Sequence, residues 1–137
     1  MKKDFIWATL INEGEKALND LKYSKAEVIF SEVMNSDHVP YPYEKEIIFL
    51  WIITIFHLKG FLSLKKIVFL TKYGEYSNFQ KSLLYLLEIT QTKENYEKAI
   101  DHIEKIMKET PELIKLYKKY LIHLPIDFQI IFKMKFY

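Results

Sequence analysis

The stretch from residue 95 to residue 111, NYEKAIDHIEKIMKETP, constrains the fold more than any other part of the chain. Its apolar residues are spaced by three or four positions, which places them on one face of an α-helix. Charged residues such as Asp101 and Glu104 take the opposite face. Asn95 is a predicted N-cap, and Pro111 is a predicted stop because proline cannot continue a helix interior. One such helix cannot bury its apolar stripe alone, so the chain must supply packed neighbours.

The composition favours a helical class. The chain has 137 residues, and half of them are hydrophobic, which is enough for one domain with its own core and argues against disorder. Its four prolines and three glycines are few, which favours long helices with short connections over a fold of strands and turns. We therefore predict an all-α protein of seven to eight helices in a single domain, residues 1–137.

Hydrophobic spacing divides the chain into successive predicted helices. Ser24 and Glu27 form a predicted capping box for the second helix, and Asp127 is a predicted cap for the last one. Gly60 is expected to end the third helix, and residues 36–42 and 72–77 are expected to be loops. The predicted helices cover residues 5–21, 24–34, 43–57, 61–71, 78–91, 95–110, 112–123 and 128–135.

Two apolar segments bear on the cellular location. Residues 47–56 are apolar except for Thr54, a run that is too short to span a bilayer and is typical of the buried centre of a domain. The N-terminal segment has lysines and an apolar run, but Glu13 and Glu15 follow without a small-residue cleavage site, so we interpret it as a helix. A cytoplasmic protein without a membrane span is favoured, unless the chain is a fragment of an exported protein.

Several kinds of chemistry have little support in the sequence. All 20 basic residues are lysine and the net charge is only +2 from interleaved signs, which disfavours nucleic-acid binding. The chain has no cysteine, and its four histidines show no ligand spacing, so we expect no metal and no other cofactor. Neither a glycine-rich phosphate loop nor a nucleophile elbow is present, so no catalytic residue is predicted.

Three parts of the chain follow one pattern of two helices and a turn. They cover residues 10–38, 48–76 and 83–111, and the pattern resembles the tetratricopeptide repeat (TPR) of about 34 residues. The resemblance implies antiparallel helical hairpins stacked as a short right-handed superhelix, with capping helices in residues 112–137.

The first copy carries the most specific part of the resemblance. Gly14, Ala26 and Phe30 stand where the family has its tight-packing glycine, small residue and aromatic residue. The middle copy departs from the family at Leu64, where a small residue is expected. The equivalent positions Ala26, Leu64 and Ala99 are 38 and 35 residues apart, both more than the family period. We expect these three residues to occupy equivalent places between paired helices.

The resemblance also implies a function and a binding surface. Domains of this family bind proteins or peptides in a concave groove lined by the first helix of each repeat. The lysine and asparagine pattern with which some members grip a peptide carboxylate is missing, so a mainly apolar peptide or helix is favoured. The groove positions carried over are Ile11, Glu15, Phe49, Ile53, Phe56, Leu84 and Glu88.

Two functions therefore compete at the level of sequence. The first is a non-enzymatic scaffold that binds a partner protein through an apolar strip formed by Phe49, Ile53 and Phe56. The second is a structural module that associates with a second copy of itself, or whose groove is filled by its own C-terminal helix. The second hypothesis rests on a strongly apolar tail, residues 128–136. The ten tyrosines and ten phenylalanines fit either a packed core or an aromatic binding surface.

Overall fold

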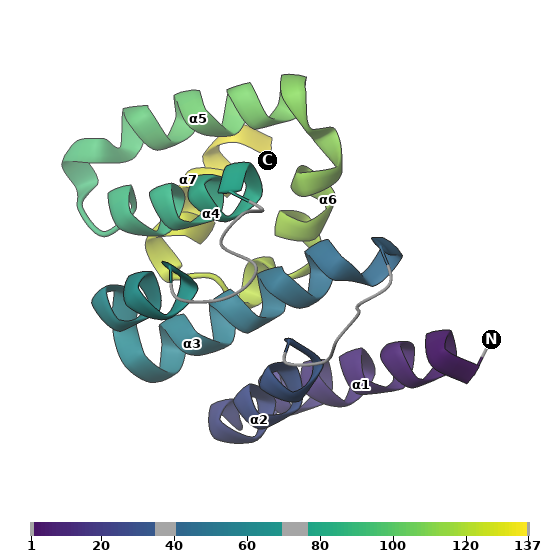
Figure 1. Cartoon of the computed structure of the whole chain (residues 1–137). Coiled ribbons are helices and arrows are strands. Elements are labelled where there is room, and N and C mark those ends of the chain that lie inside the picture. The colour runs from purple at the N-terminus through teal and green to yellow at the C-terminus, as the bar shows by residue number, and fades with distance from the viewer. Residues whose placement is uncertain (1, 35–40, 70–76, 137) are drawn as a thin grey trace. The chain divides into compact units, whose positions relative to one another are not determined.

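The computed structural model is all-α, as the hydrophobic spacing predicts (Figure 1). It describes residues 2–34, 41–69 and 77–136, and no β-strand occurs within those ranges. The helices form two compact units, Met1–Gly74 (unit 1) and Glu75–Tyr137 (unit 2). Unit 1 contains α1 (Lys2–Asn19), α2 (Tyr23–Met34) and α3 (Tyr41–Phe69), and unit 2 contains α4 (Ser77–Ile89), η1 (Lys93–Asn95), α5 (Tyr96–Glu109), α6 (Pro111–Lys119), η2 (Leu121–His123) and α7 (Ile126–Phe136).

Helices α1 and α2 form a tight hairpin because α1 has a glycine where α2 presents the ring of Phe30. A Cβ atom built on Gly14 would lie 2.3 Å from Cζ of Phe30, far inside van der Waals contact. Phe30 and Ala26 are fully buried in the same hairpin. The expectation that Gly14 permits a close helix approach is therefore confirmed.

The turn between α1 and α2 holds a leucine in a left-handed conformation. Leu21 has a φ of 59°, and the amides of Leu21 and Lys22 donate to the carbonyls of Leu18 and Ala17. These two bonds form a Schellman motif, in which the position taken by Leu21 is usually glycine. The Leu21 side chain is 68% exposed, so burial offsets little of the strain.

Leu21→Gly is expected to stabilise unit 1 by about 1 kcal/mol. Removing Cβ relieves about 1–2 kcal/mol of left-handed strain, and the extra chain entropy of glycine cancels part of that gain. The melting temperature should rise by about 4 °C or more, measured by circular dichroism. Lys22→Gly is the matched control, because Lys22 is exposed but has no positive φ, and it should bring no gain.

Helix α3 is two helical segments joined at Gly60. That residue has φ 82° and ψ 174°, a conformation that is essentially restricted to glycine. The predicted break is thus confirmed, and the third and fourth predicted helices form the two arms of α3. Every residue from 47 to 55 is buried, and both α1 and α2 pack on α3. Thr54, the one polar residue of that run, donates its hydroxyl to the carbonyl of Leu50 at 2.7 Å, which explains how it is accommodated.

One stretch, Lys45–Ile67, is long and apolar enough to cross a membrane by length and composition alone. Gly60 interrupts its helical geometry, and the straight arm before the break is about 22 Å long at 1.5 Å per residue, shorter than the roughly 30 Å hydrocarbon core. Over half of the most apolar window, 56%, is buried inside the structure. Both observations are typical of a core helix, and the absence of a membrane span stays a prediction.

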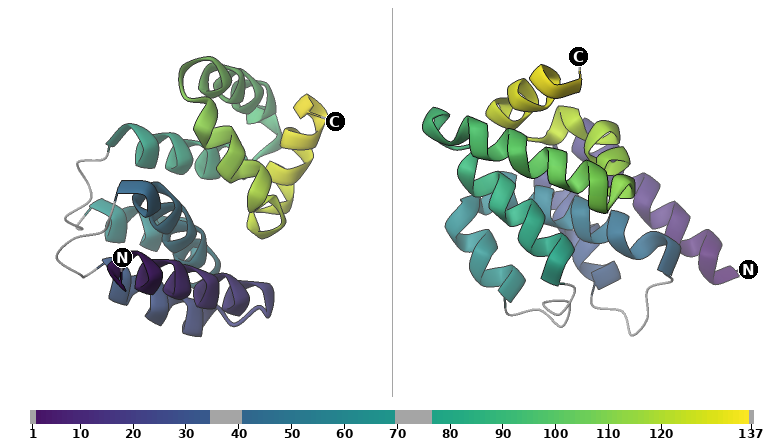
Figure 2. Two further views of the ribbon diagram at one scale, coloured as in Figure 1. Left: turned by 90° about the vertical axis from the view of Figure 1, so that its right-hand side faces the viewer. Right: turned by 90° about the horizontal axis from the view of Figure 1, so that it is seen from above.

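Unit 2 is built around α5, which packs against α4, α6 and α7 (Figure 2). Pro111 is the first residue of α6. An amide at that position has no acceptor within the helix, so the missing amide hydrogen of proline costs no helical hydrogen bond. The core includes three aromatic rings: Tyr117 lies edge-on to Phe128 and Phe132, with ring centres 5.6 and 6.5 Å away. All three side chains are fully buried, and burial raises the pKa of the Tyr117 hydroxyl. These aromatic residues serve the core and not a binding surface.

Three predicted helix caps are wrong. Ser24 and Asp127 lie inside α2 and α7, because those helices begin at Tyr23 and Ile126. Asn95 does precede α5, but its side chain makes no capping bond and instead donates to Oγ1 of Thr92 at 2.8 Å. Of the predicted loops, residues 36–40 and 72–76 lie outside the described part of the chain, whereas residues 41–42 and 77 belong to α3 and α4.

The proposed repeat positions Ala26, Leu64 and Ala99 are all fully buried. Burial is necessary for positions between paired helices but does not establish that the three are equivalent, so the equivalence stays a prediction. Leu64 follows Gly60 in the second arm of α3, where it departs from the small residue of the family pattern.

Candidate functional site

The predicted groove residues divide between the two units. Ile11 and Glu15 lie on α1, and Phe49, Ile53 and Phe56 lie on α3, all in unit 1, whereas Leu84 and Glu88 lie on α4 of unit 2. A groove that joins all of them stays a prediction. Glu88 is exposed, and Glu15, Phe56 and Leu84 are half-buried.

The expectation of an exposed apolar strip on α3 is wrong. Phe49 is 0% exposed and Ile53 is 1% exposed, so neither side chain presents a surface to a partner. The physical reason is that an all-round apolar helix is buried on all its faces when other elements cover it, and only Phe56 at the end of the run is half-buried. The strip predicted from Phe49, Ile53 and Phe56 therefore supplies no docking surface in this structure.

A small polar cluster joins α4 to α5 in unit 2. Oγ of Ser82 lies 2.8 Å from Nε2 of His102, and the ring of Tyr85 lies 4.8 Å from the His102 ring, tilted by 54°. Ser82 and His102 are half-buried. The two are 20 residues apart on different helices, so no local motif announces the pair, and it was missed in the sequence.

The Ser82–His102 pair has the spacing of a nucleophile and its base, but it lacks the other parts of such a site. An acyl-transfer serine requires free amide donors that can stabilise an oxyanion. Ser82 lies in the interior of α4, where the amides that follow are engaged in helical hydrogen bonds. The pair is best explained as a polar contact between two helices.

Lowering the pH from about 7.5 to 5.5 is expected to destabilise unit 2 through His102. Burial, and then the charge of Lys105, lowers the pKa of His102, while Glu109 acts in the opposite direction. The unfolded chain therefore takes up a proton near pH 6.5 that the folded chain binds only at lower pH, so stability falls as the pH drops through that window. The melting temperature of His102→Gln should depend less on pH across this range. An equal dependence in both proteins would contradict the assignment to His102.

The described part of the chain contains two further histidines, His57 and His123, and His38 lies outside it. His57 stacks on Tyr23 with ring centres 4.7 Å apart, and His123 is buried in η2. Within the described residues, no group of three or more histidines and carboxylates could hold a metal ion.

Helix α7 presents two apolar faces. Its inner face, formed by Phe128, Ile131 and Phe132, is fully buried. Its outer face has Ile126, Ile130 and Met134 at successive intervals of four residues, with side chains 66%, 44% and 65% exposed. We call these three residues the outer stripe. Residues four apart share a face of a helix, so the outer stripe is a contiguous exposed apolar surface.

Two polar contacts fix α7 against α5. The hydroxyl of Tyr96 donates to Oδ1 of Asp127 at 2.5 Å, and Nζ of Lys135 lies 2.5 Å from Oε1 of Glu104 and lowers the pKa of that carboxyl. Both contacts join residues 31 positions apart, so they are eight residues from each other on each helix. The two helices therefore run parallel in one register, and the outer stripe is part of an ordered element.

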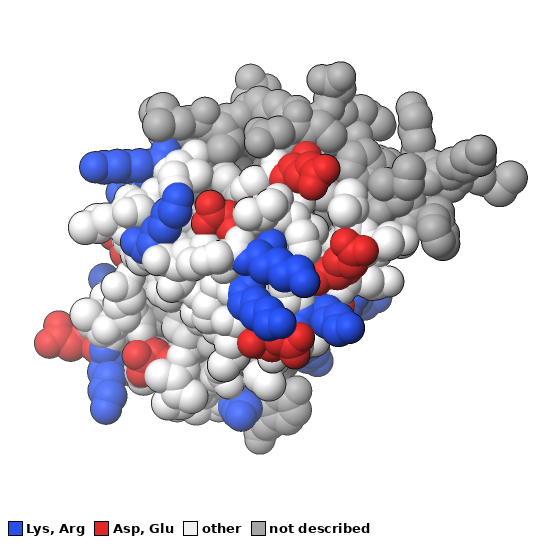
Figure 3. All heavy atoms as spheres, turned by 90° about the horizontal axis from the view of Figure 1, so that it is seen from below, with Lys and Arg blue, Asp and Glu red and all other residues white. Residues whose placement is uncertain are grey.

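Charges of both signs are mixed on the described part of the face shown in Figure 3. A nucleic-acid surface usually gathers basic residues on one face or along one helix. The described charges do not form such a stripe on α7, where only Lys133 and Lys135 follow the acidic Asp127.

Comparison with protein families, with curated proteins and with solved structures finds no match to this chain.

Proposed function

We propose that this chain is a non-enzymatic protein-interaction module that binds a partner protein through the outer stripe of α7. The observation that carries the proposal is the exposure of Ile126, Ile130 and Met134 on one face of an ordered helix. Single exposed apolar residues are common on protein surfaces, whereas contiguous exposed apolar surface usually marks an interaction site. A helix that offers an apolar face to its partner is a frequent means of protein recognition.

The proposal includes a stacked-hairpin architecture like that of TPR proteins. Each unit supplies one pair of neighbouring helices, α1 with α2 and α4 with α5, and the Gly14–Phe30 contact supports the tight packing expected of the first pair. In this proposal, the stacked hairpins support α7, and α7 binds the partner at the C-terminal end of the superhelix. An experimental structure in which Ala26 and Ala99 occupy unrelated places would remove the repeat assignment and leave the interaction surface.

The interaction is tested by replacing all three stripe residues with serine. Ile126→Ser, Ile130→Ser and Met134→Ser combined should retain the helicity of the native chain, because each side chain is exposed. The matched control carries serine at Lys105, Lys108 and Lys115, which are exposed, polar and not on α7. Proteins captured from the native organism are then purified and bound again to the native chain. Binding that is lost in the stripe variant but kept in the control supports the proposal, and equal binding to both variants overturns it.

The alternative hypothesis is an enzyme in which Ser82 is the nucleophile. A serine activated by His102 would react with a fluorophosphonate probe, because such probes label nucleophilic serines. We expect the native chain to be labelled no more strongly than the Ser82→Ala variant. Labelling that disappears in Ser82→Ala would instead favour a hydrolytic function.

A further inference from the structure

Two contacts between α4 and α5 converge on one titratable ring. Oγ of Ser82 lies 2.8 Å from Nε2 of His102, and the rings of Tyr85 and His102 have centres 4.8 Å apart. Ser82 and Tyr85 are three positions apart on α4, so they share a face of that helix. We call the packed surface between the two helices the α4–α5 seam. A change in the charge of His102 acts directly on this seam.

Helix α4 depends on the seam more than α6 and α7 do. Its main packing partner in unit 2 is α5, whereas α5 also packs on α6 and α7. Two polar contacts tie α7 to α5, and the stacked rings of Phe128 and Phe132 tie it to Tyr117 of α6. These contacts do not involve α4, so they hold α5, α6 and α7 together when the seam opens.

The surroundings of His102 disfavour its protonated form. His102 is half-buried, and burial is the main cause that lowers its pKa, followed by the positive charge of Lys105. Glu109 acts in the opposite direction and is the weakest of the three causes. From α4 the ring faces Ser82 and Tyr85, and neither is an acidic residue. Among the described residues of η1, α6 and α7, no charged group contributes to the pKa of His102.

We propose that α4 is an acid-sensitive element: when the ring of His102 takes up a proton, α4 opens locally while α5, α6 and α7 stay packed. The charged ring gains hydration by leaving the seam, and Ser82 and Tyr85 then lose the contacts that they make with it. Local opening of one helix is a smaller event than unfolding of the whole unit. It uncovers the three fully buried leucines of α4, which are Leu83, Leu86 and Leu87. The proposal concerns a different helix from the outer stripe and does not depend on the function proposed for that stripe.

Hydrogen exchange of the full chain tests the proposal at about pH 7.5 and about pH 5.5, on either side of the ordinary pKa of histidine. Protection factors, corrected for the intrinsic effect of pH on exchange, are measured for peptides from α4, α6 and α7. The opened form binds the proton more tightly than the closed form, so the opening equilibrium of α4 should rise by about threefold or more at the lower pH. The α6 and α7 peptides should change less.

Two variants assign the effect to one ring. His102→Gln is uncharged at both pH values, so the ratio of α4 opening between them should fall to that of the α6 and α7 peptides. His57→Gln is the matched control, because it makes the same replacement at an exposed histidine of α3, and it should keep the native ratio. Each ratio compares one protein with itself, so a difference in overall stability between the variants does not affect it.

Three results would overturn the proposal. The first is a native chain in which the opening of α4 is the same at both pH values. The second is an equal rise in the α4, α6 and α7 peptides, which would mean that unit 2 opens as a whole. The third is a His102→Gln chain that keeps the native ratio, which would assign the response to another group.

Discussion

Replacing Gly14 by alanine is expected to destabilise unit 1 by about 2 kcal/mol. The new methyl group would lie 2.3 Å from Cζ and 2.4 Å from Cε1 of Phe30, where carbon atoms require about 3.5–4.0 Å. Phe30 is fully buried and has no solvent into which it can move. Overpacking of this kind costs about 1–3 kcal/mol or more, and it outweighs the gain of up to about 1 kcal/mol from the higher helix propensity of alanine.

Thermal unfolding of the full chain measures this effect, and hydrogen exchange of α1 and α2 peptides localises it. Asn12→Ala is the matched control on the same helix, because Asn12 is exposed and should be neutral or slightly stabilising. Phe30→Leu removes the ring atoms that clash, so the loss in the double variant should be smaller than the sum of the two single losses. A Gly14→Ala chain that is more stable than the native one would show that the two helices do not approach closely.

Replacing Ala99 by glutamate is expected to cost unit 2 about 4 kcal/mol or more, enough to unfold it. Ala99 is fully buried on α5, next to the buried face formed by Ile103 and Ile106. A carboxylate at this position would lose its water without a partner of opposite charge, and an uncompensated buried charge costs several kcal/mol. Unfolding would appear as loss of helicity at room temperature or as a large drop in the melting temperature.

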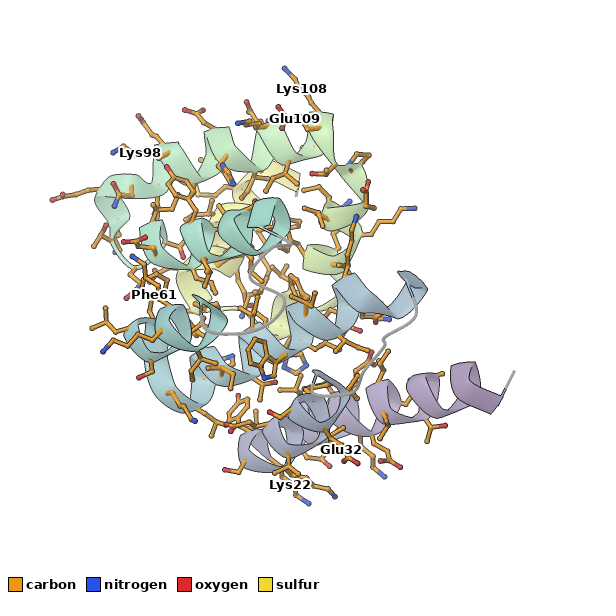
Figure 4. The ribbon with its side chains drawn as sticks, viewed as in Figure 1. Lys22, Glu32, Phe61, Lys98, Lys108 and Glu109 are labelled. Atoms are coloured by element: carbon orange, nitrogen blue, oxygen red, sulfur yellow. The ribbon has the colours of Figure 1, made fainter. Side chains whose placement is uncertain are left out.

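Lys98→Glu is the matched control for Ala99→Glu. It places the same side chain on the neighbouring residue, which is exposed and points away from the unit (Figure 4). Exposed substitutions of this type usually change the stability by less than about 0.5 kcal/mol. A melting temperature of Ala99→Glu equal to that of the control would mean that position 99 of α5 is open to water.

The helices of this protein could be located from the sequence because their apolar residues repeat with the period of the helix. Residues 95–110 predicted a helix that begins one residue later, at Tyr96, and ends one residue earlier, at Glu109. Gly60 was correctly identified as a break, because glycine has access to backbone conformations that other residues avoid. The caps failed for a different reason. Asp127 lies inside α7 because that helix begins at Ile126, and the side chain of Asn95 bonds to Thr92 and not to the backbone of α5.

The candidate site could be predicted only in part. The sequence indicated that the C-terminal tail is apolar, but Ile130 and Ile131 are adjacent, and composition alone cannot separate an exposed side chain from a buried one. Packing against α5 decides the matter, because it buries Ile131 and leaves Ile130 on the outer face. The same limit explains the error on α3, where Phe49 was expected at the surface and is buried.

The sequence by itself determined the helical class, the positions of most helices and the close approach at Gly14, because these follow from local periodicity and from the size of single side chains. The tertiary structure alone decided which apolar faces are covered, since burial depends on what packs against a helix and not on the helix itself. It also decided the Ser82–His102 contact and the register of α7 on α5, because residues 20 and 31 positions apart meet only when the chain has folded.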